Sequence, residues 1–110
     1  KYLEKIKNKD FYIIETNYND KMLSEGPYPY LLQQRIRGDS GHMSNRYAGS
    51  LLAKCIGCKT KHIILAHISE HNNDKNLVLE EVKDELKDID FDCNKLILTE
   101  QNTPSEMIEI

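Results

Sequence analysis

Short apolar runs alternate with longer polar segments along the chain and predict alternating strands and helices. Residues 11–14 and 62–66 are rich in β-branched and aromatic side chains, which is typical of buried strands. Residues 95–98 form a third run of this kind, and a short terminal strand is expected at residues 107–110. The sequence therefore predicts a sheet built largely from buried strands.

Apolar residues at helical spacing fall between these runs. The longest helix is expected to begin at Ser44 or Asn45, either of which can cap its first turn, and to end at Gly57. Asp74 can cap another helix that runs to about residue 86. Shorter helical segments are expected at residues 1–7, 22–23 and 30–36. Because strands alternate with helices, the predicted fold class is α/β with largely parallel neighbouring strands.

Composition is that of an ordinary globular domain. The chain has 110 residues, of which 39% are hydrophobic and 30% charged, and this length suits one domain or part of one. No apolar run approaches the roughly 20 residues that a membrane helix needs. The net charge of −3 excludes a general basic surface for nucleic acid, and a small group of arginines is interpreted as a solvated face: Arg35, Arg37 and Arg46.

Cysteine usage fits a reducing, cytoplasmic environment. The chain has three cysteines, Cys55, Cys58 and Cys93, and an odd number argues against a disulfide framework. Cys55 and Cys58 form a CxxC motif, but no second pair is present to complete a structural zinc site. A redox CxxC opens a helix, whereas this motif lies near the expected end of one. We interpret the motif as two small residues at a helix terminus. The alternative hypothesis is a redox protein, which an exposed, acidic Cys55 thiol would support.

Ionisable side chains follow two of the predicted strands. Glu15 comes directly after residues 11–14, and His67 directly after residues 62–66. Because ligands bind at the carboxyl ends of the strands in open α/β sheets, this carboxylate and this imidazole could meet at one site. His42 lies just before a predicted helix N-terminus, which favours an anion such as phosphate. We expect Glu15 to pair with His42 and orient it, and His67 to ligate a metal ion.

Each of these residues also has a purely structural interpretation. Glu15 can end a strand and face water, His67 can be a hydrogen-bonded residue at a strand end, and His42 can belong to a turn. Taken singly, they do not establish a site. The sequence contains no dinucleotide fingerprint, Walker loop or nucleophile elbow that would indicate another chemistry.

Several short motifs occur in one order and favour the functional interpretation. They are, in sequence, Glu15-Thr16-Asn17-Tyr18, Met22-Leu23, Gly26-Pro27-Tyr28-Pro29, Arg35-Ile36, Gly41-His42-Met43-Ser44-Asn45, Ala66-His67-Ile68-Ser69-Glu70 and Pro104-Ser105-Glu106. In this order they resemble the YycJ/WalJ group of metallo-β-lactamase-fold hydrolases over nearly the whole chain. The resemblance implies the C-terminal part of a four-layer αββα sandwich, with two divalent metal ions, zinc or manganese, at one edge of its two sheets.

The resemblance also implies a role for each candidate residue. Glu15 and His42 match a catalytic pair that delivers a proton to the leaving group, and His67 matches the last metal ligand. The helix that begins at Ser44 or Asn45 would hold the substrate phosphate through its N–H groups. Members of the group are cytoplasmic bacterial hydrolases, often described as exonucleases acting on DNA. The implied function is therefore a metal-dependent phosphodiesterase with a metal-activated water as its nucleophile.

The chain departs from the group in one respect. The HxHxDH segment, the following His ligand and the bridging Asp of the group belong upstream of Lys1 and are not in this sequence, which also opens without a methionine. One imidazole cannot build a two-metal site. We therefore expect residues 1–110 to be the C-terminal part of a single domain that lacks its N-terminal part, is inactive alone and exposes a sheet face. The alternatives are a non-catalytic module that binds a partner protein through that face, and a hydrolase of RNA or a small molecule on the same fold.

Overall fold

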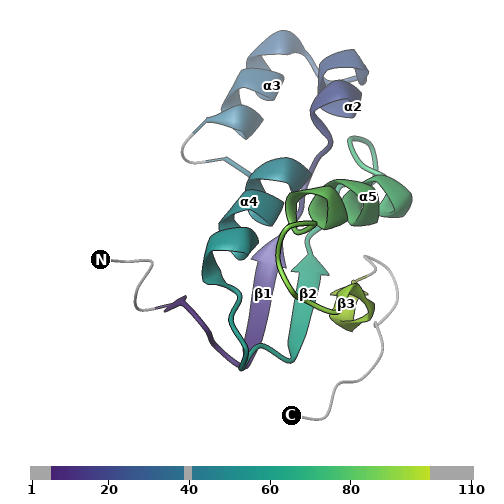
Figure 1. Cartoon of the computed structure of the whole chain (residues 1–110). Helices are drawn as coiled ribbons and strands as arrows, with labels where there is room; N and C mark the ends of the chain where they lie inside the picture. The colour runs from purple at the N-terminus through teal and green to yellow at the C-terminus, as the bar shows by residue number, and fades with distance from the viewer. Residues whose placement is uncertain (1–5, 39–40, 100–110) are drawn as a thin grey trace.

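The computed structural model describes residues 6–38 and 41–99 of the chain. Its elements are, in order, β1 (Phe11–Glu15), α2 (Asp20–Glu25), α3 (Tyr30–Arg37), α4 (Asn45–Cys55), β2 (His62–Ala66), α5 (Lys75–Glu85), the 3-10 turn η1 (Cys93–Lys95) and β3 (Leu96–Leu98) (Figure 1). The expected terminal strand at residues 107–110, the motif at residues 104–106 and most of the expected helical segment at residues 1–7 lie outside the described residues.

The three strands form one parallel sheet in the order β1-β2-β3. The register pairs Ile13 with Ile64 and Ile64 with Ile97, so these residues form one row across the sheet. Parallel neighbours require crossover connections, which here contain the helices. The prediction of an α/β fold with parallel strands is confirmed.

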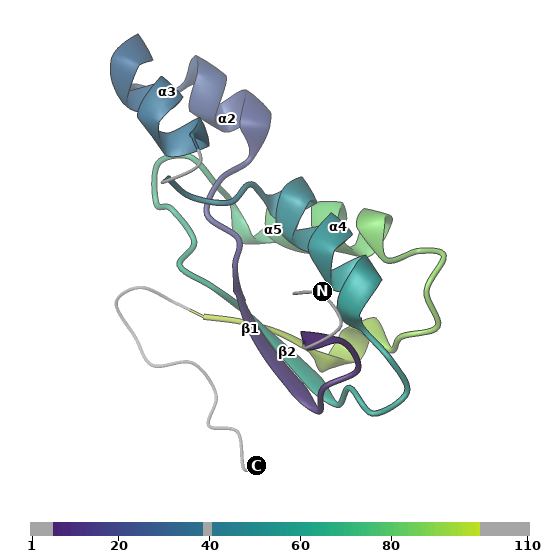
Figure 2. The ribbon, with the colours of Figure 1, turned by 90° about the vertical axis from the view of Figure 1, so that its left-hand side faces the viewer.

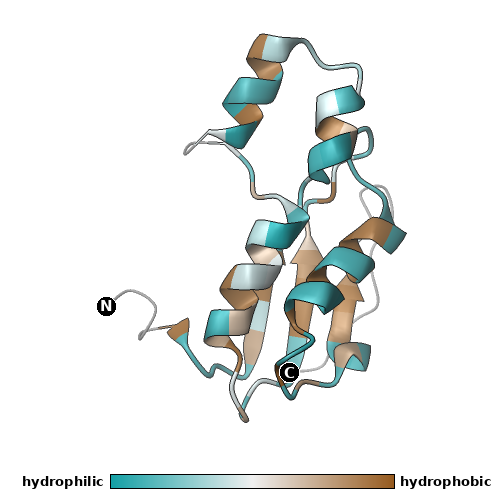
Figure 3. Cartoon of the chain, turned by 45° about the horizontal axis from the view of Figure 1, so that its top comes forward, coloured by the Kyte–Doolittle hydropathy of each residue, from teal (hydrophilic) through white to brown (hydrophobic). Residues whose placement is uncertain are grey.

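Helices α4 and α5 cover one face of the sheet, and the main core lies between these helices and the sheet (Figure 2). Figure 3 shows apolar residues along the strands and polar residues on outer turns of the helices. The fully buried residues Ile63 and Leu65 of β2 pack in this core with side chains of both helices: Leu52, Val78 and Val82. The two helices approach closely at Gly49, where an added Cβ would lie 2.9 Å from the Cβ of Glu85. Glycine therefore fits this crossing because it has no side chain.

The opposite face of the sheet carries the in-register row Ile13, Ile64 and Ile97. None of the three residues belongs to the core clusters of the described residues, and Ile13 is 66% exposed to solvent. Side chains alternate between faces along a strand, so this row points away from α4 and α5. Within residues 6–38 and 41–99, no element covers it (Figure 2). Such an apolar face is unusual because parallel sheets are normally covered on both sides.

Helices α2 and α3 stand beyond the carboxyl ends of β1 and β2 (Figure 1). A small second core of Tyr18, Leu23 and Ile36 holds them together. Arg37 of α3 donates to the Asp20 carboxylate of α2 at 2.7 Å, which adds an ion pair between the two helices. This pair of helices therefore forms a wall next to the end of the sheet where the candidate site lies.

Element boundaries follow the predicted caps closely. The Ser44 hydroxyl accepts a hydrogen bond from the Tyr47 amide and caps α4, as expected, and the Asp74 carboxylate accepts one from the Asn76 amide and caps α5. Helix α4 ends at Cys55 with Ile56 as its C-cap, so Gly57, which was expected to close the helix, is the first residue beyond the cap. No helix in the described part of the chain has the length and apolar character to cross a membrane.

Candidate acid–base and metal site

Parallel pairing of β1 with β2 brings Glu15 and His67 to the same end of the sheet. Glu15 is the last residue of β1 and pairs in register with Ala66, the last residue of β2, and His67 comes next. The segment before α4 reaches this end through two bonds. The Met43 amide donates to Glu15 Oε1 at 2.7 Å, and the Asn17 amide donates to the Met43 carbonyl at 3.0 Å. His42 is therefore placed beside the other two residues.

One carboxylate oxygen joins the three side chains. Glu15 Oε2 lies 2.9 Å from Nδ1 of His42 and 2.5 Å from Nδ1 of His67. The two imidazole rings meet edge to face, with centroids 5.1 Å apart. An ionised carboxylate can only accept hydrogen bonds, so both Nδ1 atoms act as donors. This arrangement leaves Nε2 of each ring available to a ligand or substrate.

The Glu15 carboxyl is held in its ionised form. Partial burial pushes its pKa up, but hydrogen bonds from His67, His42 and the Met43 amide together outweigh burial and hold the pKa below its ordinary value. The negative charge is thus concentrated where both imidazoles meet it. A carboxylate in this position can fix the tautomer and the orientation of each ring.

Access to the three side chains increases from Glu15 outward. The side chain of Glu15 is 23% exposed, that of His42 39% and that of His67 61%. His42 also lines two adjacent pockets of about 390 Å³ and 570 Å³. The larger pocket includes Glu15, Arg37 and Tyr47 in its wall. His42 is therefore reachable by a substrate from either side, and the carboxylate behind it is sheltered.

The structure brings together the predicted residues Glu15, His42 and His67. Their ligand atoms, one from each residue, all lie within 4.8 Å of one another. The sequence did not predict that His67 as well as His42 would bond to Glu15. The expected role of His67 as a metal ligand is compatible with this geometry, because a histidine that ligates through one ring nitrogen usually donates its other N–H to a carboxylate or carbonyl.

Ser44 and Asn45 use their side chains inside the fold. The Ser44 hydroxyl caps α4, and the fully buried Asn45 amide donates to Asn73 Oδ1 at 2.8 Å and to Glu81 Oε1 at 3.1 Å. The Asn45 backbone amide is also occupied, since it donates to the Tyr18 carbonyl at 2.9 Å. Ser44 does line the larger pocket. Their predicted role in phosphate binding stays a prediction.

A buried polar network behind the site was not predicted from the sequence. Asn73 donates to the Thr16 carbonyl at 2.9 Å, and Glu81 accepts from both Asn19 and Asn45. The network therefore connects the residue after Glu15 to the helices that cover the sheet. The sequence signal for this network was Glu81, an acidic residue directly before the apolar Val82. Both residues are buried on α5.

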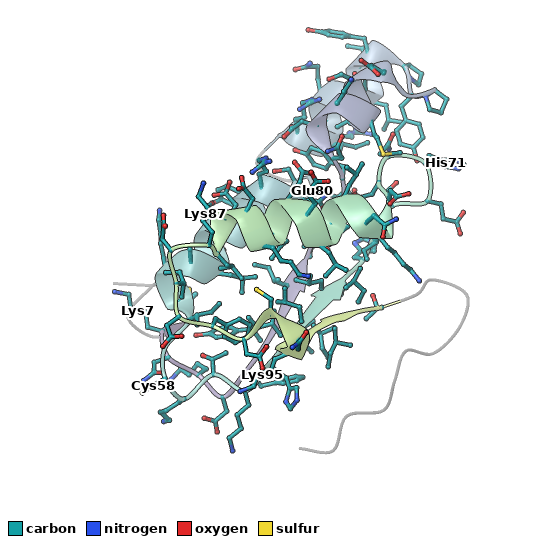
Figure 4. The ribbon with its side chains drawn as sticks, turned by 45° about the vertical axis from the view of Figure 1, so that its right-hand side comes forward. Lys7, Cys58, His71, Glu80, Lys87 and Lys95 are labelled. Carbon is teal, nitrogen blue, oxygen red and sulfur yellow. The ribbon has the colours of Figure 1, made fainter. Side chains whose placement is uncertain are left out.

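The structure does not support the redox hypothesis for the CxxC motif. Cys55 is buried, and burial raises the pKa of its thiol. Cys58 is exposed at the other end of the molecule from α2 and α3 (Figure 4). An acidic, accessible Cys55 thiol was the feature that a redox role required. The interpretation as small residues at a helix end agrees with this burial.

Comparison with known proteins identifies relatives that share most of the chain. Proteins named exodeoxyribonuclease WalJ from two strains of Streptococcus pneumoniae are 33% identical over 108 residues, which cover 96% of this chain and 40% of each relative. Exodeoxyribonuclease YycJ of Bacillus anthracis is 38% identical over 86 residues, or 78% of this chain and 33% of the relative. The chain is a homologue of the WalJ and YycJ proteins. The predicted resemblance to the YycJ/WalJ group is confirmed.

The chain thus spans about two fifths of the length of the WalJ relatives that it matches. No family model matches the chain. No solved structure matches it either.

Proposed function

We propose that this chain contributes the carboxylate–histidine side of the active centre of a metal-dependent nuclease that hydrolyses DNA phosphodiester bonds. The observation that carries the proposal is the bonding of Nδ1 of both His42 and His67 to one oxygen of Glu15 at the carboxyl ends of parallel strands. Ligand sites in open α/β sheets lie at this edge. The names of the WalJ and YycJ relatives support the nuclease activity and the DNA substrate.

His42 is proposed as the proton donor to the leaving oxygen. Its Nδ1 donates to the ionised Glu15 carboxylate at 2.9 Å, which fixes the orientation of the ring and directs Nε2 away from the carboxylate. A proton held at Nε2 can pass to an oxygen that develops negative charge as the P–O bond breaks. The carboxylate then stabilises the ring in both states and keeps the tautomer that is needed for the next turnover.

The donor set fits a divalent metal ion such as zinc or manganese. Imidazole nitrogen and carboxylate oxygen are ligands of these ions, and His67 offers Nε2 while its Nδ1 is anchored to Glu15. Two bound ions would polarise the phosphodiester and make a bound water nucleophilic near neutral pH. With His42 acting as the proton donor, the site offers too few ligands for two ions, so we propose that the chain alone is inactive and that the remaining ligands come from outside residues 1–110.

The open face of the sheet supports the proposal of a metallo-β-lactamase αββα sandwich. The row Ile13, Ile64 and Ile97 is apolar, in register and uncovered by any described element. A second sheet packed on this row would bury it, as sandwich architectures require. We propose that residues 1–110 form the C-terminal part of one such domain, with the second sheet supplied by the remaining length that the relatives have.

The basic side chains near the site do not by themselves select nucleic acid. Arg37 is paired with Asp20, and Arg46 is paired with Glu81, Asp84 and Glu85. The DNA substrate is therefore proposed from the relatives, and RNA or small phosphodiesters are the alternative substrates on the same site.

The alternative function is a non-catalytic module that binds a partner through the open sheet face. Such a module would use the same isoleucine row, but this alternative gives no role to the pairing of Glu15 with two imidazoles.

A chimeric protein tests the proposed function. The segment of Streptococcus pneumoniae WalJ that matches this chain is replaced by the corresponding residues of this chain, and degradation of end-labelled DNA and RNA is measured with added manganese or zinc. The proposal predicts metal-dependent loss of DNA ends, with a much slower reaction on RNA. A folded chimera that binds metal and degrades neither polymer would contradict the nuclease function.

A further inference from the structure

We propose that Asn17 is a positioning residue, whose side-chain amide holds His67 in the backbone conformation that lets its imidazole reach Glu15. The contacts that carry the inference lie within this chain, and only its consequence for catalysis rests on the proposed function. Nothing in the motif pattern had assigned a role to Asn17 beyond its place in the Glu15-Thr16-Asn17-Tyr18 string.

His67 has an unusual backbone. Its φ is 57°, in the left-handed region, and Asn8 is the one other non-glycine residue with a positive φ in residues 6–38 and 41–99. For an L-residue with a Cβ this region is disfavoured, because the Cβ comes too close to the following carbonyl oxygen. The side chain of His67 is 61% exposed, so packing around the ring does not enforce the conformation. A hydrogen bond to the His67 backbone would stabilise this conformation.

Asn17 makes that contact. Its Nδ2 donates to the His67 carbonyl at 2.8 Å, and its own carbonyl accepts from the Ser69 amide at 2.9 Å. The two bonds together fix the three-residue segment that begins at His67. Only 8% of Asn17 is exposed, so water does not readily replace the side-chain bond.

The same residue also fixes the segment that carries His42. The Asn17 amide donates to the Met43 carbonyl at 3.0 Å, while the Met43 amide donates to Glu15. These are backbone bonds and do not depend on the side chain at position 17. Loss of the Asn17 side chain should therefore release His67 from Glu15 and leave the pairing of His42 with Glu15 in place.

The proposal is tested on the full 110-residue chain by nuclear magnetic resonance. Asn17→Asp removes the donor with almost no change of shape and places a carboxylate oxygen against the His67 carbonyl. Asn17→Ala removes the group. Val82→Ala in the core of α5 is the control for a general loss of stability, because Val82 is fully buried and belongs to the main core away from the site. We expect both Asn17 variants to lose two signals while Val82→Ala keeps both.

The two signals report on His67 alone. One is the strong amide-to-Hα contact within residue 67 that a positive φ produces, and the other is the proximity of the His67 ring to Glu15. The unsubstituted chain gives a third readout that needs no variant, a through-bond coupling between Asn17 Nδ2 and the His67 carbonyl carbon. An unchanged φ and ring position in the Asn17 variants, or a missing coupling together with rapidly exchanging Asn17 amide protons, would overturn the proposal.

Zinc titration of the same proteins separates this inference from the proposed function. If the chain binds zinc at the site, Asn17→Asp should weaken the binding at least about tenfold, as loss of a supporting contact to a metal ligand typically does, and Val82→Ala should not. If the unsubstituted chain binds no zinc but Asn17→Asp still releases His67, Asn17 remains a positioning residue and the metal site proposed for this chain is what fails.

Discussion

Glu15 is the residue on which both imidazoles of the site depend. A single oxygen accepts from His42 and His67, and the second oxygen accepts from the Met43 amide. The backbone explains this convergence, because Glu15 ends β1 beside the end of β2. A glutamine at this position would keep the shape but lose the charge, and its NH₂ group would face a donor.

Glu15→Gln should therefore impair the WalJ chimera strongly. We expect the rate of DNA degradation to fall by about two orders of magnitude or more, which is the usual size of a general acid–base contribution. Glu80→Gln is the matched control, because Glu80 is exposed on α5 (Figure 4) and does not belong to the cluster of Glu15, His42 and His67. Equal rates for the two variants would contradict the role assigned to Glu15.

The lowered pKa of Glu15 also makes stability depend on pH. Because its pKa in the folded chain lies below the ordinary value of 4.5, the ionised carboxylate stabilises the fold above that value, and this contribution is lost as the pH falls through the folded-state pKa. Urea unfolding at about pH 7 and about pH 3 should show a larger loss of unfolding free energy for the unsubstituted chain than for Glu15→Gln. The same loss in both proteins would be inconsistent with a carboxylate stabilised by its imidazoles.

At the scale of elements, the site is positioned by contacts between loops and helices. The Asn73 amide bonds the Thr16 carbonyl directly after β1, and Asn45 at the start of α4 bonds both Asn73 and Glu81 of α5. The network holds the ends of β1, α4 and α5 in one arrangement. Its members are buried, so each lost bond leaves a polar group without a partner.

Asn45→Ala should destabilise the chain through this network. Removing the amide leaves polar atoms of Asn73 and Glu81 buried without it, and we expect the unfolding free energy to fall by about 2–3 kcal/mol. Asn76→Ala on the exposed side of α5 is the control and should stay within about 0.5 kcal/mol. Denaturant unfolding measures both variants. A loss in Asn45→Ala no greater than that in the control would show that the network contributes little to stability.

At the scale of the whole molecule, the sequence predicted the main strands and helices and the three site residues. It predicted less well the contacts that hold the site residues in place. Apolar periodicity and cap residues are local signals, so β1, β2, α4 and α5 could be placed to within a residue or two. The order of the motifs indicated Glu15, His42 and His67. The sharing of one oxygen, the left-handed backbone of His67 and the clamp by Asn17 depend on contacts between distant loops, which leave no periodic trace in the sequence.

The open sheet face gives a prediction about the proposed sandwich. In the 110-residue chain, Ile13→Ser should change the unfolding free energy by no more than about 0.5 kcal/mol because Ile13 is mostly exposed, whereas Ile63→Ala should cost about 2–5 kcal/mol. In the WalJ chimera, Ile13→Ser should become clearly destabilising, since a second sheet would cover this row. An Ile13→Ser variant without effect in either protein would contradict the sandwich.

The most direct test of the central claim compares His42→Ala and His67→Ala in the chimera, with metal content and DNA hydrolysis measured on the same samples. His62→Ala is the control, because His62 begins β2 at the end of the sheet opposite the site and pairs in register with Phe11. The account predicts that His67→Ala loses both metal and activity, that His42→Ala keeps its metal but loses rate, and that the control keeps both. Full metal loss in His42→Ala with none in His67→Ala would contradict the roles assigned to these two residues.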